Sequence, residues 1–282
     1  MSESPSSSAQ AARAVIASRL GELRRGAELT GHELALRCGW SPAKSSRIER
    51  AKTPASDSDI RAWCTACGAE DQITDLIAEN RRADQMYVHW QKLHRHGMRR
   101  AQDEVVPLYK STRNFRVYCS NVIPGMLQTE AYAAALLSTI AAFQDTPDDS
   151  PSAAASRVER SQVLYEGGHR FALLMEETVL HYRIGDADTM AGQLGYLLAT
   201  MALPNVSLGI IPFTAERRVW PLEAFYLFDD RRVSVELLTA AVNVSAPSEI
   251  AAYAKAFSQL AEIAVYGSDA RTLVTEAINS LG

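Results

Sequence analysis

The sequence has 282 residues, which is long enough for two domains, and its 47% hydrophobic and 22% charged residues are typical of soluble globular proteins. No apolar run approaches the roughly 18 residues that a membrane-spanning helix needs. Residues 1–100 contain 16 Lys and Arg against 12 Asp and Glu, whereas residues 101–282 contain 13 against 21, so a basic front precedes an acidic rear. This asymmetry favours a nucleic-acid-binding module joined to a domain that does not bind nucleic acid.

The first ten residues are rich in serine and lack the basic and apolar segments of a signal peptide. Residues 1–10 are therefore predicted to be a disordered tail. A first helix is expected from Ala11 to Arg25, because Ile16, Leu20 and Leu23 form an apolar stripe. Without a secretion signal, the cysteines are expected to be reduced thiols in a cytoplasmic protein.

The stretch Thr30–Lys52 predicts two short helices separated by one glycine. Thr30 is suited to cap the start of the first helix, and Gly39 to end it in the left-handed conformation. Ser41 is suited to cap the second helix, and Pro42 follows in its first turn, where a missing N–H costs nothing.

The spacing of apolar residues divides each of these two helices into an inner and an outer face. The inner faces are predicted to carry Leu34, Ala35, Cys38, Ser45 and Ile48, and the outer face of the second helix Ala43, Lys44, Ser46, Arg47 and Arg50. This pattern predicts a helix-turn-helix whose second helix is shaped to enter a DNA major groove. An ordinary helical hairpin with a solvated basic face is the alternative.

The position of each polar residue predicts the kind of DNA contact it makes. Base edges are expected to be contacted by Ala43, Lys44, Ser46 and Arg47, and phosphates by Thr30, Ser41, Arg50 and Lys52. One such domain covers few base pairs, so a homodimer on two half-sites about 34 Å apart is also expected.

The run Ser41–Arg50 resembles the recognition helix of the lambda-repressor-like, or xenobiotic-response-element, regulators. Two positions depart from the pattern of that family. Gly31 stands where a phosphate-contacting glutamine is usual, and Ala51 stands where a glycine usually closes the second helix. The resemblance implies a five-helix DNA-binding domain over residues 11–80.

The remaining two helices of this domain are predicted from Asp57 or Ser58 to Cys67, which Gly68 ends, and from Glu70 onwards. Cys64 and Cys67 share a helical stripe with Ile60 and Trp63, and zinc would need a second pair of ligands. These cysteines are therefore interpreted as core residues, and no metal or cofactor is expected.

Residues 81–106 are predicted to form a helical connector, because helical spacing continues beyond Asn80 through Tyr87, Trp90 and Leu93. The connector contains three histidines without carboxylate or cysteine companions, and solvated or partner-facing positions are favoured over a metal site; they are His89, His94 and His96. Tyr87 and Trp90 are placed to transmit a signal from the rear domain to the DNA-binding domain.

Residues 107–282 are predicted to be an α+β domain with a mostly antiparallel sheet. Strands are expected at Phe115–Cys119, Phe171–Met175 and Asn205–Pro212, followed by a hairpin of Phe225–Phe228 and Val233–Leu237. Helices are expected at Thr129–Ala142, Ser156–Tyr165, Ala187–Ala202, Ser248–Val265 and Ser268–Leu281. The segment Asp145–Ser156 is rich in Pro, Asp, Ser and Ala and is predicted to be a flexible loop.

A series of collinear segments in this rear part resembles the C-terminal domain of actinobacterial WhiJ-like regulators. The matching segments are Val122–Glu130, Arg157–Gln162, Met175–Leu180, Gln193–Leu194, Pro204–Val206 and Ile211–Phe213. Members of that family often occur beside a small partner protein and are described as antitoxin-like. The resemblance therefore implies a regulator with a possible small cognate protein partner, and it implies little about ligand chemistry.

No catalytic pattern stands out in the rear domain, so an enzyme is not expected. Glu176 and Glu177 would point to opposite faces of a strand, and no nucleophile elbow, phosphate loop or zinc-protease motif occurs. Six residues could line a polar pocket or belong to a solvated surface: Arg157, Arg160, His169, Arg170, Glu177 and His181. Five aromatic residues could line a ligand cavity or belong to the core: Tyr118, Tyr165, Phe213, Trp220 and Phe225.

These observations together predict a dimeric, sequence-specific transcriptional regulator whose rear domain is controlled by a small-molecule effector or a small protein partner. The alternative is an antitoxin-type protein that binds a small cognate protein and autoregulates its operon. An enzyme tethered to DNA is the third class, and a turnover assay would separate it from the other two.

Overall fold

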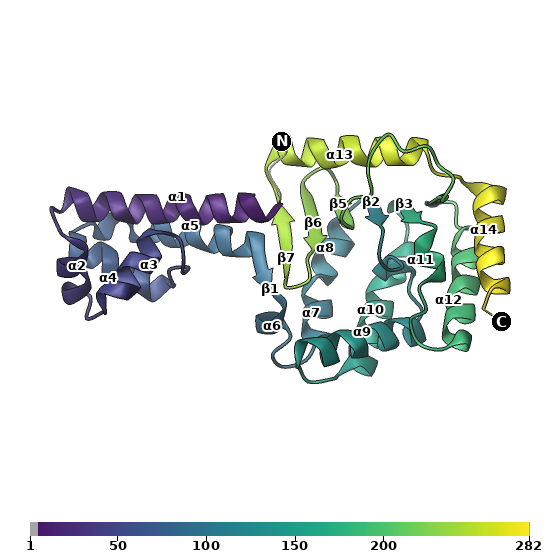
Figure 1. Ribbon diagram of the computed structural model, residues 1–282, viewed down its shortest axis with the longest axis horizontal. Coiled ribbons are helices and arrows are strands. Elements are labelled where there is room, and N and C mark those ends of the chain that lie inside the picture. Colours follow the sequence, from purple (N-terminus) through teal and green to yellow (C-terminus); the bar gives the residue numbers. More distant parts are fainter. Residues whose placement is uncertain (1–4, 282) are drawn as a thin grey trace. The chain divides into compact units, whose positions relative to one another are not determined.

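The computed structural model describes the backbone of residues 5–281, and the side chains of these residues except 5–11, 82–89 and 91–92. The chain divides into two compact units, Met1–Val88 and His89–Gly282 (Figure 1). The expected tail at residues 1–10 falls partly on residues 1–4, which lie outside the described residues, while residues 5–10 belong to the first helix. None of the described helices is long and apolar enough to cross a membrane.

The first unit is a bundle of α-helices built around one apolar core. Its elements are α1 (Pro5–Gly26), α2 (Gly31–Arg37), α3 (Pro42–Glu49), α4 (Asp57–Cys67), the 3₁₀ turn η1 (Glu70–Gln72) and α5 (Ile73–Met86). Leu20, Leu34 and Ile60 are fully buried there, and the indole N–H of Trp63 donates a hydrogen bond of 2.9 Å to the carbonyl of Leu20. This hydrogen bond satisfies the polar atom of the largest core side chain and ties α4 to α1.

The predicted helical connector is not one continuous helix. Strand β1 (Tyr87–His89) follows α5, and the short helix α6 (Trp90–Leu93) comes next. Within the second unit, the Trp90 backbone N–H donates to the carbonyl of Thr239 (3.1 Å) and its indole N–H to that of Leu237 (2.8 Å). The backbone hydrogen bond is incompatible with a continuous helix here, because such a helix would use the backbone N–H of Trp90 internally.

The second unit contains a mixed sheet whose strands lie in the order β7-β6-β5-β2-β3-β4. The strands are β2 (Asn114–Cys119), β3 (Arg170–Glu176), β4 (Val206–Ile211), β5 (Phe225–Phe228), β6 (Arg232–Glu236) and β7 (Ala240–Val244). The pairs β2–β3 and β3–β4 are parallel, and the other pairs are antiparallel. The predicted α+β class with a mostly antiparallel sheet is therefore confirmed, although β7 was not predicted.

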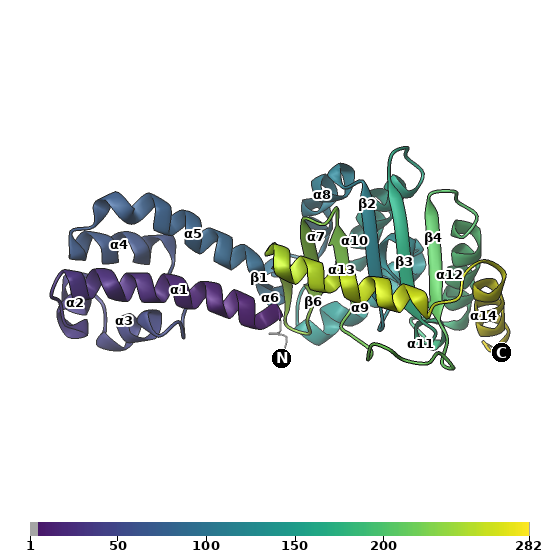
Figure 2. The same ribbon diagram turned by 90° about the horizontal axis from the view of Figure 1, so that it is seen from above.

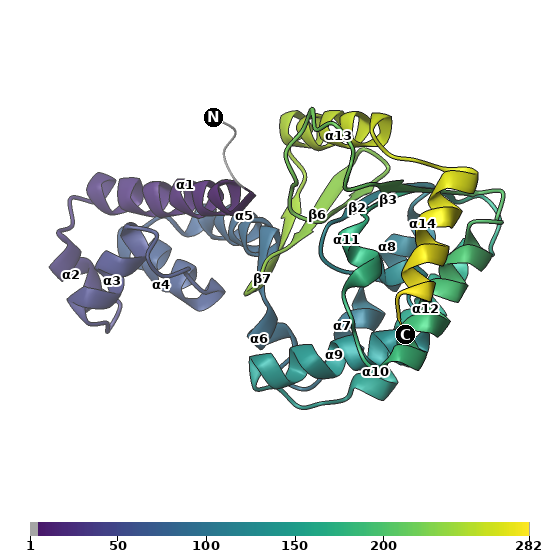
Figure 3. The same cartoon turned by 45° about the vertical axis from the view of Figure 1, so that its right-hand side comes forward.

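Helices cover both faces of this sheet (Figures 2 and 3). Helix α13 (Pro247–Glu262) lies across one face. The other face is covered by helices that include α7 (Arg99–Glu104), α8 (Val106–Ser111), α9 (Glu130–Gln144), α10 (Ser150–Arg160) and α12 (Ala187–Thr200). The 3₁₀ turns η2 (Gly125–Leu127) and η3 (Ser161–Leu164), together with α11 (Thr178–His181) and α14 (Gly267–Asn279), complete the unit.

The sheet face toward α7–α10 changes character from one half to the other. In β2 and β3 it is apolar, with Phe115 and Phe171 buried and stacked at 4.8 Å between ring centroids. Across β5, β6 and β7 the same face carries a row of directly opposed polar residues, Tyr226, Ser234 and Asn243. The apolar half forms the core, and the polar half places hydrogen-bonding groups beneath α7–α10.

The predicted loop at Asp145–Ser156 is wrong over much of its length, because α10 begins at Ser150. Pro151 lies in the first turn of α10, where proline is tolerated. Ala153 and Ala154 are fully buried and pack in one cluster with residues of α9 that include Leu137. Small alanines permit this close helix contact, and the many Pro, Asp and Ser residues around them concealed the helical signal. Helix α10 ends at Arg160, short of the expected Tyr165.

Candidate nucleic-acid interface

The start of α2 is fixed by the side chain of Thr30. The Thr30 hydroxyl accepts a hydrogen bond of 3.2 Å from the backbone N–H of Glu33, and the Glu33 carboxylate accepts one of 2.8 Å from the backbone N–H of Thr30. This reciprocal capping box confirms the prediction that Thr30 caps α2. It also holds the pKa of the Glu33 carboxyl below its usual value, first through the backbone N–H of Thr30.

The turn between α2 and α3 follows the predicted plan with one difference. Gly39 has a positive φ of 68°, and the backbone N–H of Trp40 donates to the carbonyl of Ala35 (2.8 Å), which closes the end of α2. Ser41 occupies the N-cap position of α3 and Pro42 the first turn, as predicted, but the Ser41 hydroxyl makes no capping hydrogen bond. The exposed Ser41 hydroxyl therefore has no role in closing this helix end.

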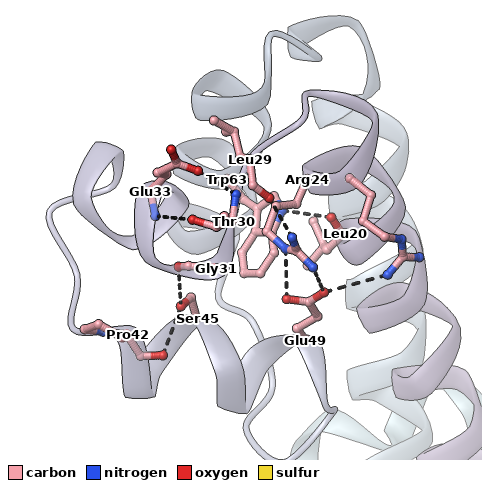
Figure 4. A network of polar contacts seen from close by, with 11 residues as sticks. Leu20, Arg24, Leu29, Thr30, Gly31, Glu33, Pro42, Ser45, Glu49 and Trp63 are labelled. Carbon is pink, nitrogen blue, oxygen red and sulfur yellow. Dashed lines mark hydrogen bonds and ion pairs between the residues drawn. The ribbon is translucent and has the colours of Figure 1, made fainter.

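Helix α3 turns one face into the core and the other outward, as the spacing predicted. Ile48 is 2% exposed and Ser45 is 1% exposed. The Ser45 hydroxyl lies 3.3 Å from the carbonyl of Gly31 and 3.1 Å from that of Pro42 (Figure 4). On the outer face Ala43, Arg47 and Arg50 are exposed, and Lys44 and Ser46 are half-buried. The outer face is thus a short basic surface.

The residues predicted to contact phosphates lie around this surface. Ser41 stands just before α3, Arg50 and Lys52 just after it, and Thr30 just before α2. All four are exposed. The structure therefore places Ser41, Arg50 and Lys52 at the two ends of α3, and Thr30 at the start of α2.

Lys44 differs from the other predicted base-contacting residues because its charge already has partners. Its ammonium group lies 2.5 Å from a carboxylate oxygen of Asp59 in α4 and 4.3 Å from the ring centroid of Trp40. Partial burial opposes ionisation of Asp59, but hydrogen bonds from Lys44 and Ser56 prevail and lower the pKa of its carboxyl. The sequence did not reveal this ion pair, since the two residues are distant in the chain.

An ion-pair network joins α3 to α1 (Figure 4). The Arg24 guanidinium donates to both carboxylate oxygens of Glu49, at 2.6 and 3.1 Å, and also to the carbonyl of Leu29 at 2.6 Å. Both side chains are mostly buried, with 16% and 22% of their surface exposed. The hydrogen bonds to Glu49 are the main cause of the raised pKa of Arg24. This network orients α3 on α1 and neutralises the carboxylate that α3 carries beside its basic face.

The end of α3 has the geometry of a glycine-closed helix although no glycine is present. The backbone N–H of Lys52 donates to the carbonyl of Arg47 (2.8 Å), and that of Ala51 to the carbonyl of Ile48 (2.9 Å). These two hydrogen bonds define a Schellman motif, and Ala51 accordingly adopts a φ of +53°. Alanine instead of glycine at position 51 therefore leaves the geometry of the helix end unchanged, but its Cβ atom makes this conformation strained.

A groove of about 730 Å³ lies between α1 and α3, beside the basic face of α3. Arg25, His32 and Arg50 are among the residues that line it. Arg25 and His32 were not among the predicted DNA contacts. Neither belongs to the predicted recognition helix, and the packing of α1 and α2 against α3 brings both to the groove.

The polar residues singled out in the rear domain do not form one site. Arg157 and Arg160 lie together on α10, where both donate to Gln102. His169 instead lies 2.7 Å from the carbonyl of Thr112, and Glu177 accepts from the backbone N–H of Phe213. Arg170 and His181 are exposed. The sequence-derived set therefore separates into the neighbouring arginines of α10, His169 and Arg170 at the start of β3, and Glu177 and His181 beside Phe213.

Glu176 is buried in a separate cluster at the end of β3. The Tyr118 hydroxyl donates to its carboxylate (2.7 Å), and the Arg217 guanidinium binds both carboxylate oxygens.

The five aromatic residues singled out in the sequence differ in burial. Tyr118 and Phe225 are core residues, whereas Tyr165, Phe213 and Trp220 are exposed. The five aromatic residues therefore do not line a common cavity.

Comparisons with known protein families agree with this division into two units. Residues 15–76 match the model of a helix-turn-helix domain, the class of fold that DNA-binding regulators use. Residues 103–276 match the model of a domain of unknown function, DUF5753. A comparison with curated proteins found no match. Because the second match covers more than half of the sequence, the chain belongs to the DUF5753 family, and it carries a helix-turn-helix domain ahead of that domain.

Proposed function

We propose that the protein is a sequence-specific transcriptional regulator in which α3 contacts base edges in the DNA major groove. The observation that carries this proposal is the outer face of α3, where Ala43 and Arg47 are exposed beside half-buried Ser46. The opposite face is fixed by Ser45 and Ile48, so the basic face is held ready for contact. Preorganised donors of this kind suit recognition of base edges.

Phosphate contacts are assigned to the exposed residues around α3. Thr30, Ser41, Arg50 and Lys52 remain the proposed contacts, and the groove between α1 and α3 adds Arg25 and His32. Phosphate contacts supply affinity and salt dependence, whereas base contacts supply sequence discrimination. The protein is further proposed to act as a homodimer on two half-sites, because a single α3 covers few base pairs.

The second unit is proposed to control DNA binding by recognising a ligand or a small protein partner. Its role is inferred to be binding rather than catalysis. Support comes from Glu176, whose carboxylate is already engaged by Arg217 and Tyr118 and is not free to act as a general base. A ligand that controls DNA binding must favour one of two states of the protein.

Selection of binding sites from random DNA with the wild type and variants tests the proposed recognition helix. Arg47→Ala should cost about 1–3 kcal/mol on the selected site and relax one base position, since a bidentate arginine–guanine contact is worth this much. Arg50→Ala should weaken binding to all sequences alike. The control is Arg61→Ala, an exposed arginine of α4, which should leave the selected sequence unchanged. An unchanged selection with Arg47→Ala would overturn the assignment of α3.

A further inference from the structure

Two arginines in the second unit lie side by side on α10 and share a neutral partner. The carbonyl oxygen of the Gln102 side chain accepts hydrogen bonds from Arg157 Nε and Arg160 Nη1, each at 3.1 Å. Arg157 Nη1 also donates to the side-chain oxygen of Gln128 (2.7 Å). Two like charges are thus held together by amide oxygens, which cannot neutralise them.

Neither arginine has an acidic partner at ion-pair distance among the residues that the structure describes. Arg160 is only 8% exposed, and its buried Nε atom has no hydrogen-bond partner. Its guanidinium lies over the ring of Tyr109, at 4.6 Å from the centroid. A buried guanidinium with an unused donor is unfavourable unless an anion completes its hydrogen bonds.

The surroundings of this pair are half-buried and polar. Burial lowers the pKa of Arg157 and raises that of Tyr226 on β5. Arg157 and Tyr226 are both half-buried, so solvent reaches part of each side chain. The backbone N–H of Gly125 donates to the Tyr226 hydroxyl (3.0 Å) and brings the turn η2 to the same place.

The polar groups around the pair come from several elements. Gln102 lies on α7, Tyr109 on α8, Tyr226 on β5 and Glu236 on β6. Glu236 is exposed, and its charge opposes the lowering of the Arg157 pKa that burial causes, but it does not reach ion-pair distance. Among the residues that the structure describes, Glu236 is the carboxylate whose charge acts on Arg157, so the positive charge of the two guanidiniums is not balanced.

We propose that the second unit contains a binding site for a small organic anion, whose carboxylate or phosphate group binds between Arg157 and Arg160. Planar guanidinium groups bind both kinds of anion in a bidentate manner. The anion would accept the hydrogen bond that Arg160 Nε leaves unused. This inference names the ligand class for the proposed control by the second unit, and it rests on the proposed function only in that respect.

Anion binding is measured on the intact protein without DNA, by titration calorimetry and thermal melting with citrate and with inorganic phosphate. Sodium chloride at equal ionic strength serves as the control salt. Both probe anions also stabilise proteins generally by exclusion from the surface, and that effect does not saturate. For the wild type, citrate or phosphate is expected to give saturable stabilisation that exceeds the effect of sodium chloride. Stronger binding of citrate would identify a carboxylate ligand, and stronger binding of phosphate a phosphate ligand.

Arg160→Gln and Arg157→Gln are expected to weaken anion binding at least tenfold, and either variant alone suffices if the other does not fold. Arg170→Gln removes the same charge from an exposed position on β3 and should bind like the wild type. Equal binding by the wild type and the Arg160 or Arg157 variant, or only a linear response in all proteins, would overturn the proposal. Because no DNA is used, failure of operator binding and failure of this site are distinguishable.

Discussion

The ammonium group of Lys44 lies 2.5 Å from the carboxylate of Asp59, so a residue expected to contact DNA bases is held by a salt bridge to the neighbouring helix α4. The Trp40 ring adds a cation–π contact on another side. Asp59 in turn belongs to the capping box at the start of α4 with Ser56. Lys44 must therefore leave Asp59 if it is to reach a base edge.

Asp59→Asn is expected to tighten DNA binding, because it frees the charge of Lys44 for the DNA. The dependence of log affinity on log salt concentration should steepen by about one unit, because one more positive charge becomes available to the DNA. Fluorescence anisotropy over a range of salt concentrations measures both quantities. Asp57→Asn is the matched control, because Asp57 lies on the same helix and pairs with Arg81 instead. Equal tightening in both variants would mean that net charge alone is responsible.

Glu49→Gln is expected to destabilise the first unit by about 1–2 kcal/mol, between the values for exposed and buried ion pairs, because Arg24 loses a partly buried partner. Chemical denaturation followed by tryptophan fluorescence measures the loss, with Trp63 in the core of this unit. Glu22→Gln on the exposed side of α1 serves as the control. If both variants have the same stability, the network between α1 and α3 does not hold α3 in place.

Ala51→Gly is expected to stabilise the first unit by about 0.5–1 kcal/mol, since glycine removes the left-handed strain but is more flexible in the unfolded chain. The opposite substitution, from glycine to alanine at a left-handed position, can be made at Gly39 in the turn between α2 and α3. Gly39→Ala places a Cβ at a φ of +68° with no atom within 4 Å of it, so it tests conformation without a clash. It should lower stability by about 1 kcal/mol. A loss of stability with Ala51→Gly would show that the Cβ of Ala51 contributes more through packing than it costs in strain.

Trp90→Ala is expected to change operator affinity, or its response to an effector, if the second unit controls the first through this segment. The contacts of Trp90 described above lie within the second unit, where its indole binds the carbonyl of Leu237 and stacks on His94. Simple anchoring of α6 is therefore the competing explanation. Melting temperature and DNA affinity should be measured on the same preparations. A lower melting temperature with unchanged affinity and response would leave only the anchoring role.

Asp229→Asn is expected to reduce the loss of stability of the second unit at acid pH. Burial opposes ionisation of Asp229, but hydrogen bonds from the backbone N–H groups of Arg113 and Asn114 lower the pKa of its carboxyl below the unfolded value. The stability that the ionised Asp229 contributes is therefore complete above the unfolded pKa of about 3.9. It is lost as pH falls through the folded pKa. Melting temperatures between pH 2 and 7 test this, with Asp230→Asn on the same turn as control.

The features that the sequence predicted best are those with a local cause. The positions of Ser45 and Ile48 follow from the helical repeat, and the conformation of Gly39 follows from the missing side chain. The Lys44–Asp59 ion pair and the sharing of Gln102 by two arginines could not be predicted in this way. They join residues that are far apart in sequence, and a neutral glutamine carries no charge signal that would mark its role.

The row of polar residues on one face of β5–β7 also affects how readily these strands open transiently. Tyr226, Ser234 and Asn243 give β5–β7 hydrogen-bonding partners on one face, where β2 and β3 have buried aromatic and aliphatic side chains. Segments with less apolar burial open more readily, and their amide hydrogens exchange with solvent sooner. The amides of β6 and β7 should therefore exchange faster than those of β3, and a ligand bound against this face should slow them selectively.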